Sequence, residues 1–195
     1  TVTHCEVAAD FLEAGVHVLV EKPITATAAE AVRLIELAQQ RGRVLQVGHL
    51  ERFNPAILAV AGELTAPRFI ESSRLAPFRT RGTDVSVVLD LMIHDIDLIQ
   101  NIVRAPIATI DAVGAPVFTD EIDIANARLR FENGCVADVT ASRISLKTER
   151  KLRVFSTDAY VSIDYQKKYG IVARKTGNLS AIRDAVARAR GRASC

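Results

Sequence analysis

The chain has 195 residues, of which 49% are hydrophobic and 25% are charged, and its formal net charge at pH 7 is +2. A polypeptide of this length and composition can bury a hydrophobic core in one domain, or in one domain and a fragment of another. The nearly neutral charge argues against a nucleic-acid-binding face, and no apolar run reaches the ~18 residues of a membrane span.

The cysteines indicate the redox compartment. Cys5, Cys135 and Cys195 are far apart and odd in number, and none belongs to a Cys-x-x-Cys motif. This pattern argues against a disulfide framework and against a zinc knuckle. We therefore expect the protein in the reducing cytoplasm.

The first fifty residues alternate between helical and strand patterns. We predict a helix over 3–14, capped by Thr3 and ended by Gly15, and a strand over 16–20 that is buried on both faces. A second helix is predicted over 27–41 and a second strand over 44–47. This alternation is typical of a doubly wound α/β sheet, so we assign residues 1–49 to the second half of such a domain.

The remainder of the chain predicts an α+β domain over residues 50–175. A helical stretch from Asn54 to Leu64, a strand over 68–75 and a long helix over 85–103 come first. Strands are then predicted over 109–117, 122–131, 136–144, 152–156 and 160–165, with a tight turn at 132–134. We expect a mostly antiparallel open sheet with helices on one face, followed by a basic tail over 176–195.

The first candidate for chemistry is Lys22, between Glu21 and Pro23 at the end of the first strand. Ligands of doubly wound sheets bind beyond the carboxyl ends of the strands. A lysine in this position can donate a hydrogen bond to a substrate hydroxyl or to a developing carbonyl, and Pro23 biases its backbone away from helical geometry. Taken alone, however, a lysine after a strand is more often a solvated surface residue.

The second candidate is a polar stripe on the predicted long helix. Asp90, His94 and Asp97 are spaced i, i+4 and i+7, so they are expected to project from one face. His94 is the natural proton acceptor, and a neighbouring carboxylate would orient it. The alternative is a structural His–Asp pair that holds two domains together.

Metal binding and a polar loop are further alternatives near these residues. His49 together with the three residues of the stripe could form a nitrogen and oxygen site, but no second cluster fixes its geometry, so we predict no metal. The segment from Gly48 to Pro55 follows a strand and is rich in polar side chains. It is either a polar loop or a ligand-contacting one.

Together, these motifs resemble the Gfo/Idh/MocA family of NAD(P)-dependent oxidoreductases. The resemblance extends to about Tyr165 and implies the C-terminal half of a Rossmann domain, followed by a domain whose open sheet carries substrate and subunit contacts. It implies that Lys22, Asp90 and His94 are catalytic. The cofactor side would be formed by Thr3, His4, Glu21, Lys22, Pro23 and Arg52, and the substrate side by His49, Glu51 and Asp97.

Within this family the chain is similar to the bacterial branch that oxidises nucleotide-linked amino sugars. The resemblance implies a sugar or nucleotide-sugar substrate, such as UDP-N-acetylglucosamine oxidised at C3. It also implies NAD or NADP as the cofactor, with NAD favoured, and a homodimer or homotetramer with neither nucleic-acid nor membrane partners.

Two features depart from the family pattern. The sequence contains no Gly-x-Gly-x-x-Gly turn to hold a pyrophosphate, and its end after Lys175 differs from the closing elements of the family. Because the chain also begins at Thr1 without a methionine, we expect an incomplete polypeptide. The alternative function is a non-catalytic module that binds sugar or dimerises through its sheet and lacks the phosphate loop.

Overall fold

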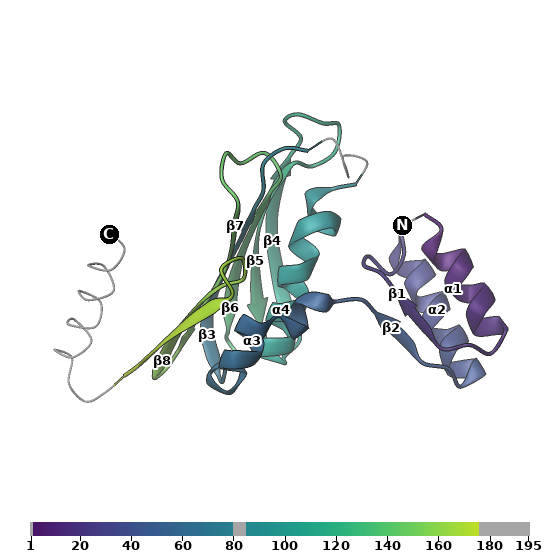
Figure 1. Cartoon of the computed structure of the whole chain (residues 1–195), viewed down its shortest axis with the longest axis horizontal. Helices are drawn as coiled ribbons and strands as arrows, with labels where there is room; N and C mark the ends of the chain where they lie inside the picture. Colours follow the sequence, from purple (N-terminus) through teal and green to yellow (C-terminus); the bar gives the residue numbers. More distant parts are fainter. Residues whose placement is uncertain (1, 80–84, 176–195) are drawn as a thin grey trace. The chain divides into compact units, whose positions relative to one another are not determined.

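The computed structural model describes residues 2–79 and 85–175 (Figure 1). The chain divides into two compact units, residues 1–51 and 52–195, and each has its own hydrophobic core. The predicted basic tail over 176–195 lies outside the described residues.

The first unit consists of two helices and two parallel strands. Its elements are α1 (His4–Glu13), β1 (Val18–Val20), α2 (Ala28–Arg41) and β2 (Leu45–Val47). β1 pairs with β2 in parallel, with Val18 opposite Leu45. The predicted alternation of helix and strand is therefore confirmed.

Local signals explain the ends of α2. The Glu30 backbone N–H donates to Thr27 Oγ1 at 3.3 Å, and the Thr27 N–H donates to Glu30 Oε2 at 3.0 Å, which completes a capping box. Gly42 ends the helix in the left-handed conformation, at φ +60°. The prediction that Thr3 caps α1 is wrong in one respect. Thr3 occupies the N-cap position, but its backbone is helical rather than extended and its side chain makes no capping bond.

The core of the first unit lies between its helices and one face of the strand pair. Leu12 of α1 and Leu34 of α2 are fully buried, and Val18 and Leu45 pack against them. Successive strand residues point to opposite faces, so Leu19 points away from the helices and is 69% exposed. The prediction that this strand is buried on both faces is therefore wrong.

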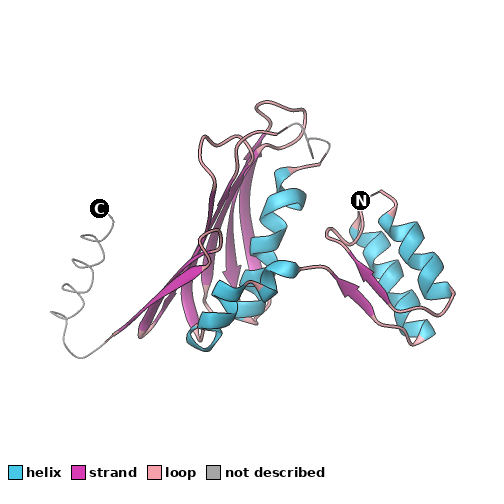
Figure 2. Cartoon of the chain, in the orientation of Figure 1, coloured by secondary structure: helices cyan, strands magenta, loops and turns pink. Residues whose placement is uncertain are grey.

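The second unit is built on one seven-stranded sheet (Figure 2). The strand order is β4-β5-β6-β3-β7-β8-β9, and only β3 and β6 pair in parallel, so the predicted mostly antiparallel sheet is confirmed. The strands are β3 (Pro67–Leu75), β4 (Ile107–Ala115), β5 (Ile124–Phe131), β6 (Val136–Ser142), β7 (Glu149–Ser156), β8 (Ala159–Asp164) and β9 (Tyr169–Arg174).

Helices cover one face of this sheet, and the other face is open (Figure 1). They are α3 (Pro55–Val60) and α4 (Ile93–Val103); short 3-10 helices span Leu50–Phe53 and Ala61–Glu63. Buried side chains of β3, β6 and β7 belong to the same hydrophobic core as Leu98 and Ile99 of α4. The open face is polar, with ion pairs between Arg128 and Asp138 and between Arg153 and Glu71.

Two elements of the second unit differ from the prediction. The long helix predicted over 85–103 is not a continuous α-helix, because its first turn, Val88–Met92, is a π-helix and α4 starts only at Ile93. In addition, β9 was not predicted. It is an edge strand whose six residues are all exposed, so its sequence carries no alternation of buried and exposed positions.

Candidate active site

The first group of candidate residues gathers at the carboxyl edge of β1 and β2. Glu21 and Lys22 directly follow β1, and Gly48 directly follows β2 and donates its backbone N–H to the Val20 carbonyl at 2.8 Å. A Cβ atom on Gly48 would lie 3.0 Å from Glu21 Oε2. Glycine at position 48 therefore leaves the space that the Glu21 carboxylate occupies.

His4 links the start of α1 to the turn that carries Lys22. His4 Nδ1 lies 2.8 Å from the carbonyl oxygen of Pro23. Because a carbonyl only accepts hydrogen bonds, Nδ1 carries the proton and donates it. The Lys22–Pro23 peptide bond is cis. Thr3 lies beside His4 at the exposed start of α1.

Glu21 and Lys22 lie where doubly wound sheets bind their ligands. Parallel strands of this kind present their carboxyl ends to such ligands, and Lys22 and Glu21 lie at this edge. A pyrophosphate normally lies on a glycine-rich turn at a helix N-terminus, and the sequence contains no Gly-x-Gly-x-x-Gly motif. The described edge therefore offers side chains beyond the strand ends, where a dinucleotide would lie, but no glycine-rich motif for its pyrophosphate.

The second group of candidates lies on and before α4. His94 and Asp97 are three residues apart within α4, so they share a face, as predicted. Asp90 belongs to the π-helical turn that precedes them, so its direction does not follow from α-helical spacing. All three residues are partly buried.

Asp97 forms a bidentate ion pair with Arg52. Arg52 Nε donates to Asp97 Oδ2 at 2.7 Å and its terminal nitrogen donates to Oδ1 at 2.5 Å. These hydrogen bonds raise the pKa of Arg52. A residue predicted on the cofactor side and one predicted on the substrate side thus bind each other, and the pair ties the 3-10 helix at 50–53 to α4.

His49 and Glu51 lie close together in sequence, between β2 and α3. His49 donates its backbone N–H to the Val47 carbonyl at 2.8 Å, and Glu51 lies in the 3-10 helix that follows. Both are partly buried. They belong to the first unit, together with Lys22, whereas Arg52, Asp90, His94 and Asp97 belong to the second.

Sequence reasoning missed a buried ion pair next to His94. Arg74 Nε donates to Asp95 Oδ2 at 2.6 Å and its terminal nitrogen donates to Oδ1 at 3.2 Å. The two side chains are only 3% and 1% exposed. The sequence signal for this pair was a basic residue, Arg74, at an inward position of a strand, and an acidic residue, Asp95, at an inward position of an apolar helix.

A second buried carboxylate holds the loop between β4 and β5. Asp123 accepts hydrogen bonds from the backbone N–H groups of Val117, Phe118 and Thr119, at 2.7 to 2.9 Å. Burial alone would raise the pKa of Asp123. The three backbone hydrogen bonds and one from the Thr119 hydroxyl outweigh this effect and hold the pKa well below its usual range. Arg143, 3.7 Å from Asp123, also donates to the Val85 carbonyl shortly before the π-helical turn.

Within residues 2–79 and 85–175, no group of three or more His, Cys, Asp or Glu side chains could hold a metal ion. Among the same residues, no helix is long and apolar enough to cross a membrane.

Fold and site together define a class of protein. A parallel βαβ unit with a lysine at its ligand-binding edge, joined to a unit with an open sheet, is typical of dinucleotide-dependent α/β oxidoreductases. Residues 1–49 match the oxidoreductase family with an NAD-binding Rossmann fold, and residues 57–162 match the Gfo/Idh/MocA C-terminal domain. The chain belongs to the Gfo/Idh/MocA family, as the sequence motifs predicted.

Individual relatives support this assignment. UDP-N-acetylglucosamine 3-dehydrogenase from Acidithiobacillus ferrooxidans is 45% identical over 167 residues, which are 85% of this chain and 53% of that protein. A solved structure of that enzyme superposes with a TM-score of 0.86 at 41% identity, over 90% of this chain and 59% of the other.

A more distant solved structure shares the fold. WlbA dehydrogenase from Bordetella pertussis, in complex with NADH and UDP-GlcNAcA, superposes with a TM-score of 0.75 at 18% identity, over 83% of this chain and 52% of the other. The chain spans about half the length of the curated relatives it matches.

Proposed function

We propose that the chain is part of an NAD-dependent dehydrogenase that oxidises a hydroxyl of a nucleotide sugar. The proposed substrate is UDP-N-acetylglucosamine, and the group oxidised is its C3 hydroxyl. The observation that carries this proposal is the 45% identity over 167 residues to an enzyme of that name, a stretch that is 85% of this chain. Lys22 at the β1 edge and His94 on α4 supply a hydrogen-bond donor and a proton acceptor of the kind that this chemistry needs.

In the proposed mechanism each catalytic residue has one task. The bound nicotinamide supplies a hydride acceptor for the hydrogen on the sugar carbon. His94 accepts the proton of the sugar hydroxyl, and Asp90 orients the imidazole. Lys22 donates a hydrogen bond to the same oxygen and stabilises it as it becomes a carbonyl.

We assign binding roles to the neighbouring residues. Thr3, His4, Glu21, Pro23 and Arg52 contact the cofactor, and His49, Glu51 and Asp97 contact the sugar nucleotide. The bond between His4 and Pro23 and the close approach of Gly48 to Glu21 support this assignment, because they fix the turn that carries Lys22. Arg52 and Asp97 form an ion pair, which supports a proposal in which the cofactor contact of Arg52 and the substrate contact of Asp97 are adjacent.

The proposal includes the cofactor, the assembly and the location. NAD is proposed over NADP because related structures were solved with NADH. A homodimer or homotetramer would use the open face of the sheet, where Phe155 packs against Phe69 and Tyr160 with ring centroids 6.0 and 5.0 Å away. A cytoplasmic location agrees with Cys5 and Cys135, which are buried free thiols.

Enzyme assays test the proposal directly. The protein is incubated with UDP-N-acetylglucosamine and NAD, and the formation of NADH and of the 3-keto product is followed. In the comparison reactions, NADP replaces NAD or myo-inositol replaces the nucleotide sugar. We expect turnover with the nucleotide sugar and NAD. If the protein binds UDP-N-acetylglucosamine in calorimetry but never reduces NAD, the non-catalytic module becomes the better interpretation.

A further inference from the structure

An acidic residue lies on the buried face of α4, in the first turn of the helix. Asp95 directly follows His94 and is 1% exposed, and the other buried residues of α4 are Leu98, Ile99 and Val103, each 6% exposed or less. An apolar residue would be expected there, because a buried carboxylate is costly unless it is paired. Its partner is Arg74.

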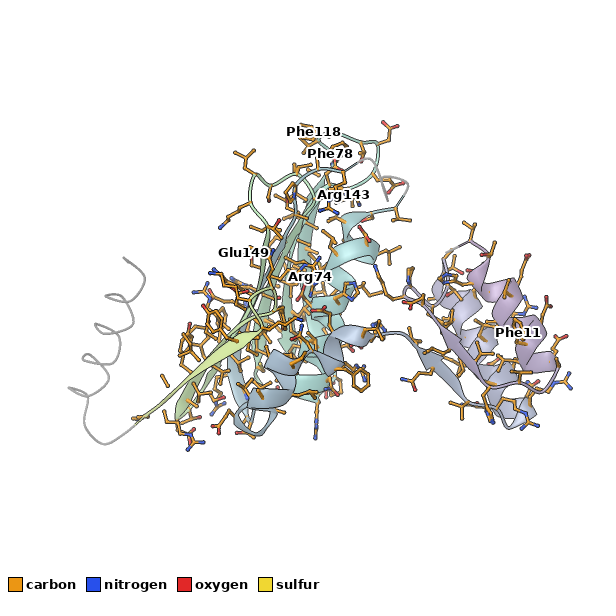
Figure 3. All side chains as sticks on the ribbon, viewed as in Figure 1. Phe11, Arg74, Phe78, Phe118, Arg143 and Glu149 are labelled. Carbon is orange, nitrogen blue, oxygen red and sulfur yellow. The ribbon has the colours of Figure 1, made fainter. Side chains whose placement is uncertain are left out.

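Arg74 reaches Asp95 from the central strand of the sheet. β3 lies between β6 and β7, and its inward side chains are Ile70, Ser72 and Arg74. In Figure 3, Arg74 lies between the sheet and α4. Its guanidinium carbon is 5.9 Å from the centre of the buried Tyr165 ring. The arginine is thus enclosed by the carboxylate, the ring and the sheet.

Stability alone does not account for this pair. The desolvation of two buried charges offsets most of their attraction, and well-packed apolar residues of similar volume are often equally stabilising or better. The pair instead fixes an orientation. Two hydrogen bonds join one planar guanidinium to one planar carboxylate, so neither group can turn relative to the other.

The π-helical turn makes such a fixed orientation necessary. A π-helical turn contains more residues than an α-helical one. The rotation of α4 about its axis therefore does not follow, by regular α-helical spacing, from the position of the segment before Val88. A side-chain tip lies ~6 Å from a helix axis, so a rotation of ~20° would displace it by ~2 Å. Asp95 is the first residue after His94 and is bound to the rigid sheet, so it can set the direction of the His94 side chain.

We propose that Arg74 is a positioning residue: through its bidentate bond to Asp95 it fixes the rotation of α4 and thereby aims His94 at its substrate. This inference rests on the proposed function, in which His94 accepts the hydroxyl proton. A displacement of ~1 Å in a catalytic group can lower turnover by about 100-fold.

Arg74→Lys keeps the positive charge but removes the bidentate geometry. We expect its kcat to fall by about 10- to 100-fold, while KM for the sugar nucleotide and for NAD changes by less than about threefold. The matched control is Arg174→Lys. Arg174 also forms a bidentate pair, with Glu63, but on an exposed edge strand, and this variant should keep the wild-type kcat. A wild-type kcat in Arg74→Lys would overturn the inference.

A double variant separates positioning from stability. Arg74→Met with Asp95→Leu replaces the pair by apolar side chains of similar size and should keep or raise the melting temperature. If Arg74 positions His94, this folded protein still has a strongly reduced kcat. Recovery of the wild-type kcat would show that the pair only fills space.

A measurement without substrate keeps the inference independent of the proposed activity. NMR spectra of protein with isotope-labelled histidine, with His94 assigned through His94→Gln, report the surroundings of its ring. We expect the His94 resonances to shift in Arg74→Lys and to stay unchanged in Arg174→Lys. If the wild type does not oxidise UDP-N-acetylglucosamine, the proposed function fails while this spectrum still decides the role of Arg74; unchanged His94 resonances in Arg74→Lys would contradict that role.

Discussion

At the scale of single residues, the edge formed by β1 and β2 depends on contacts that leave little freedom to the Lys22 turn. The hydrogen bond from His4 holds the Pro23 carbonyl, and the missing side chain of Gly48 makes room for Glu21. Both contacts flank Lys22, so the position of this lysine is determined by its neighbours on each side.

Replacing Lys22 by alanine tests its proposed catalytic role. A group that acts mainly in the transition state contributes to turnover more than to binding. We expect Lys22→Ala to lower kcat by about 10²- to 10⁴-fold, while the dissociation constant of NADH, measured by fluorescence titration, changes little. Lys167→Ala, in the exposed turn after β8, is the control and should behave as the wild type. Equal losses of turnover and of NADH affinity would mean that Lys22 binds the cofactor rather than catalysing.

Replacing Gly48 by alanine tests the space it leaves for Glu21. The new Cβ would lie 3.0 to 3.4 Å from the three carboxyl-group atoms of Glu21, so this side chain must shift. We expect kcat/KM for NAD to fall at least severalfold, with a loss of melting temperature of only a few degrees. The matched control is Gly62→Ala, where no atom lies within 4 Å of the added Cβ. Identical kinetics of the two variants would show that the position of Glu21 does not matter.

At the scale of elements, the loop between β4 and β5 is held by one carboxylate. Three consecutive backbone N–H groups and a hydroxyl all donate to Asp123, and Arg143 extends this network to the segment before the π-helical turn. In Figure 3, Arg143 lies near the Phe78 and Phe118 pair, whose rings meet edge to face at 5.5 Å. Protonation of Asp123 would weaken all of these contacts together.

We therefore expect stability to fall in acid. The pKa of Asp123 is lower in the folded than in the unfolded state, so its contribution to the free energy of unfolding is fully present above pH ~5 and is lost as the pH falls toward the folded-state pKa. Hydrogen bonds from Lys147, Ser73 and Lys151 likewise lower the pKa of Glu149 to about 2, against the opposing effect of burial. Melting temperatures of the wild type should therefore decline from about pH 5 to pH 3.

Asp123→Asn isolates the part of this decline that belongs to the loop. The variant should be less stable at neutral pH and should lose less stability between pH 5 and pH 3, because an amide does not titrate there. Part of the decline should remain, because Glu149 is unchanged. A variant with the same pH dependence as the wild type would argue that Asp123 is not responsible.

Local sequence signals predicted much of the fold, and they failed where the structure depends on distant contacts. The helix over 27–41 was predicted because its cap, its apolar spacing and the glycine that follows it all lie within one short segment. The π-helical turn was missed because no residue type marks it, and β9 was missed because an exposed edge strand lacks alternation. Fold class and strand positions are thus readable from sequence, but local distortions are not.

The candidate site shows the same division. Lys22 and His94 were predicted as site residues from their places after a strand and on an apolar helix, which are local features. The pairing of Arg74 with Asp95 joins residues 21 positions apart across a strand and a helix, and the pairing of Arg52 with Asp97 spans 45 positions. Sequence showed these charges individually, but only the packing of α4 identified their partners.

At the scale of the whole molecule, we expect self-association through the open face of the sheet. Thr140 lies on this face in β6, where its hydroxyl accepts a hydrogen bond from Asn126 at 2.9 Å. A bulky charged residue there would prevent close approach of a second sheet. Light scattering after gel filtration should show a dimer or tetramer for the wild type and monomers for Thr140→Arg.

Gln40→Arg is the control for this experiment. It adds the same charge at an exposed position of α2 in the first unit and should leave the assembly unchanged. A monomeric wild type, or a Thr140→Arg variant that still associates, would mean that the open face is not the contact surface.

The strand order also has a consequence for the order of folding. β4-β5-β6 and β7-β8-β9 are two meanders of sequence neighbours, each of which can form locally, whereas β3 joins them and pairs with residues more than 60 positions later. Long-range pairings carry the largest loop-closure cost, so we expect β3 to dock late. Ile70→Val, which removes a buried methylene of β3 between Ala137 and Val154, should cost about 1 kcal/mol and, in stopped-flow experiments, mainly speed unfolding. Of the seven strands in this sheet, the one that the ribosome makes first would then be the last to pair.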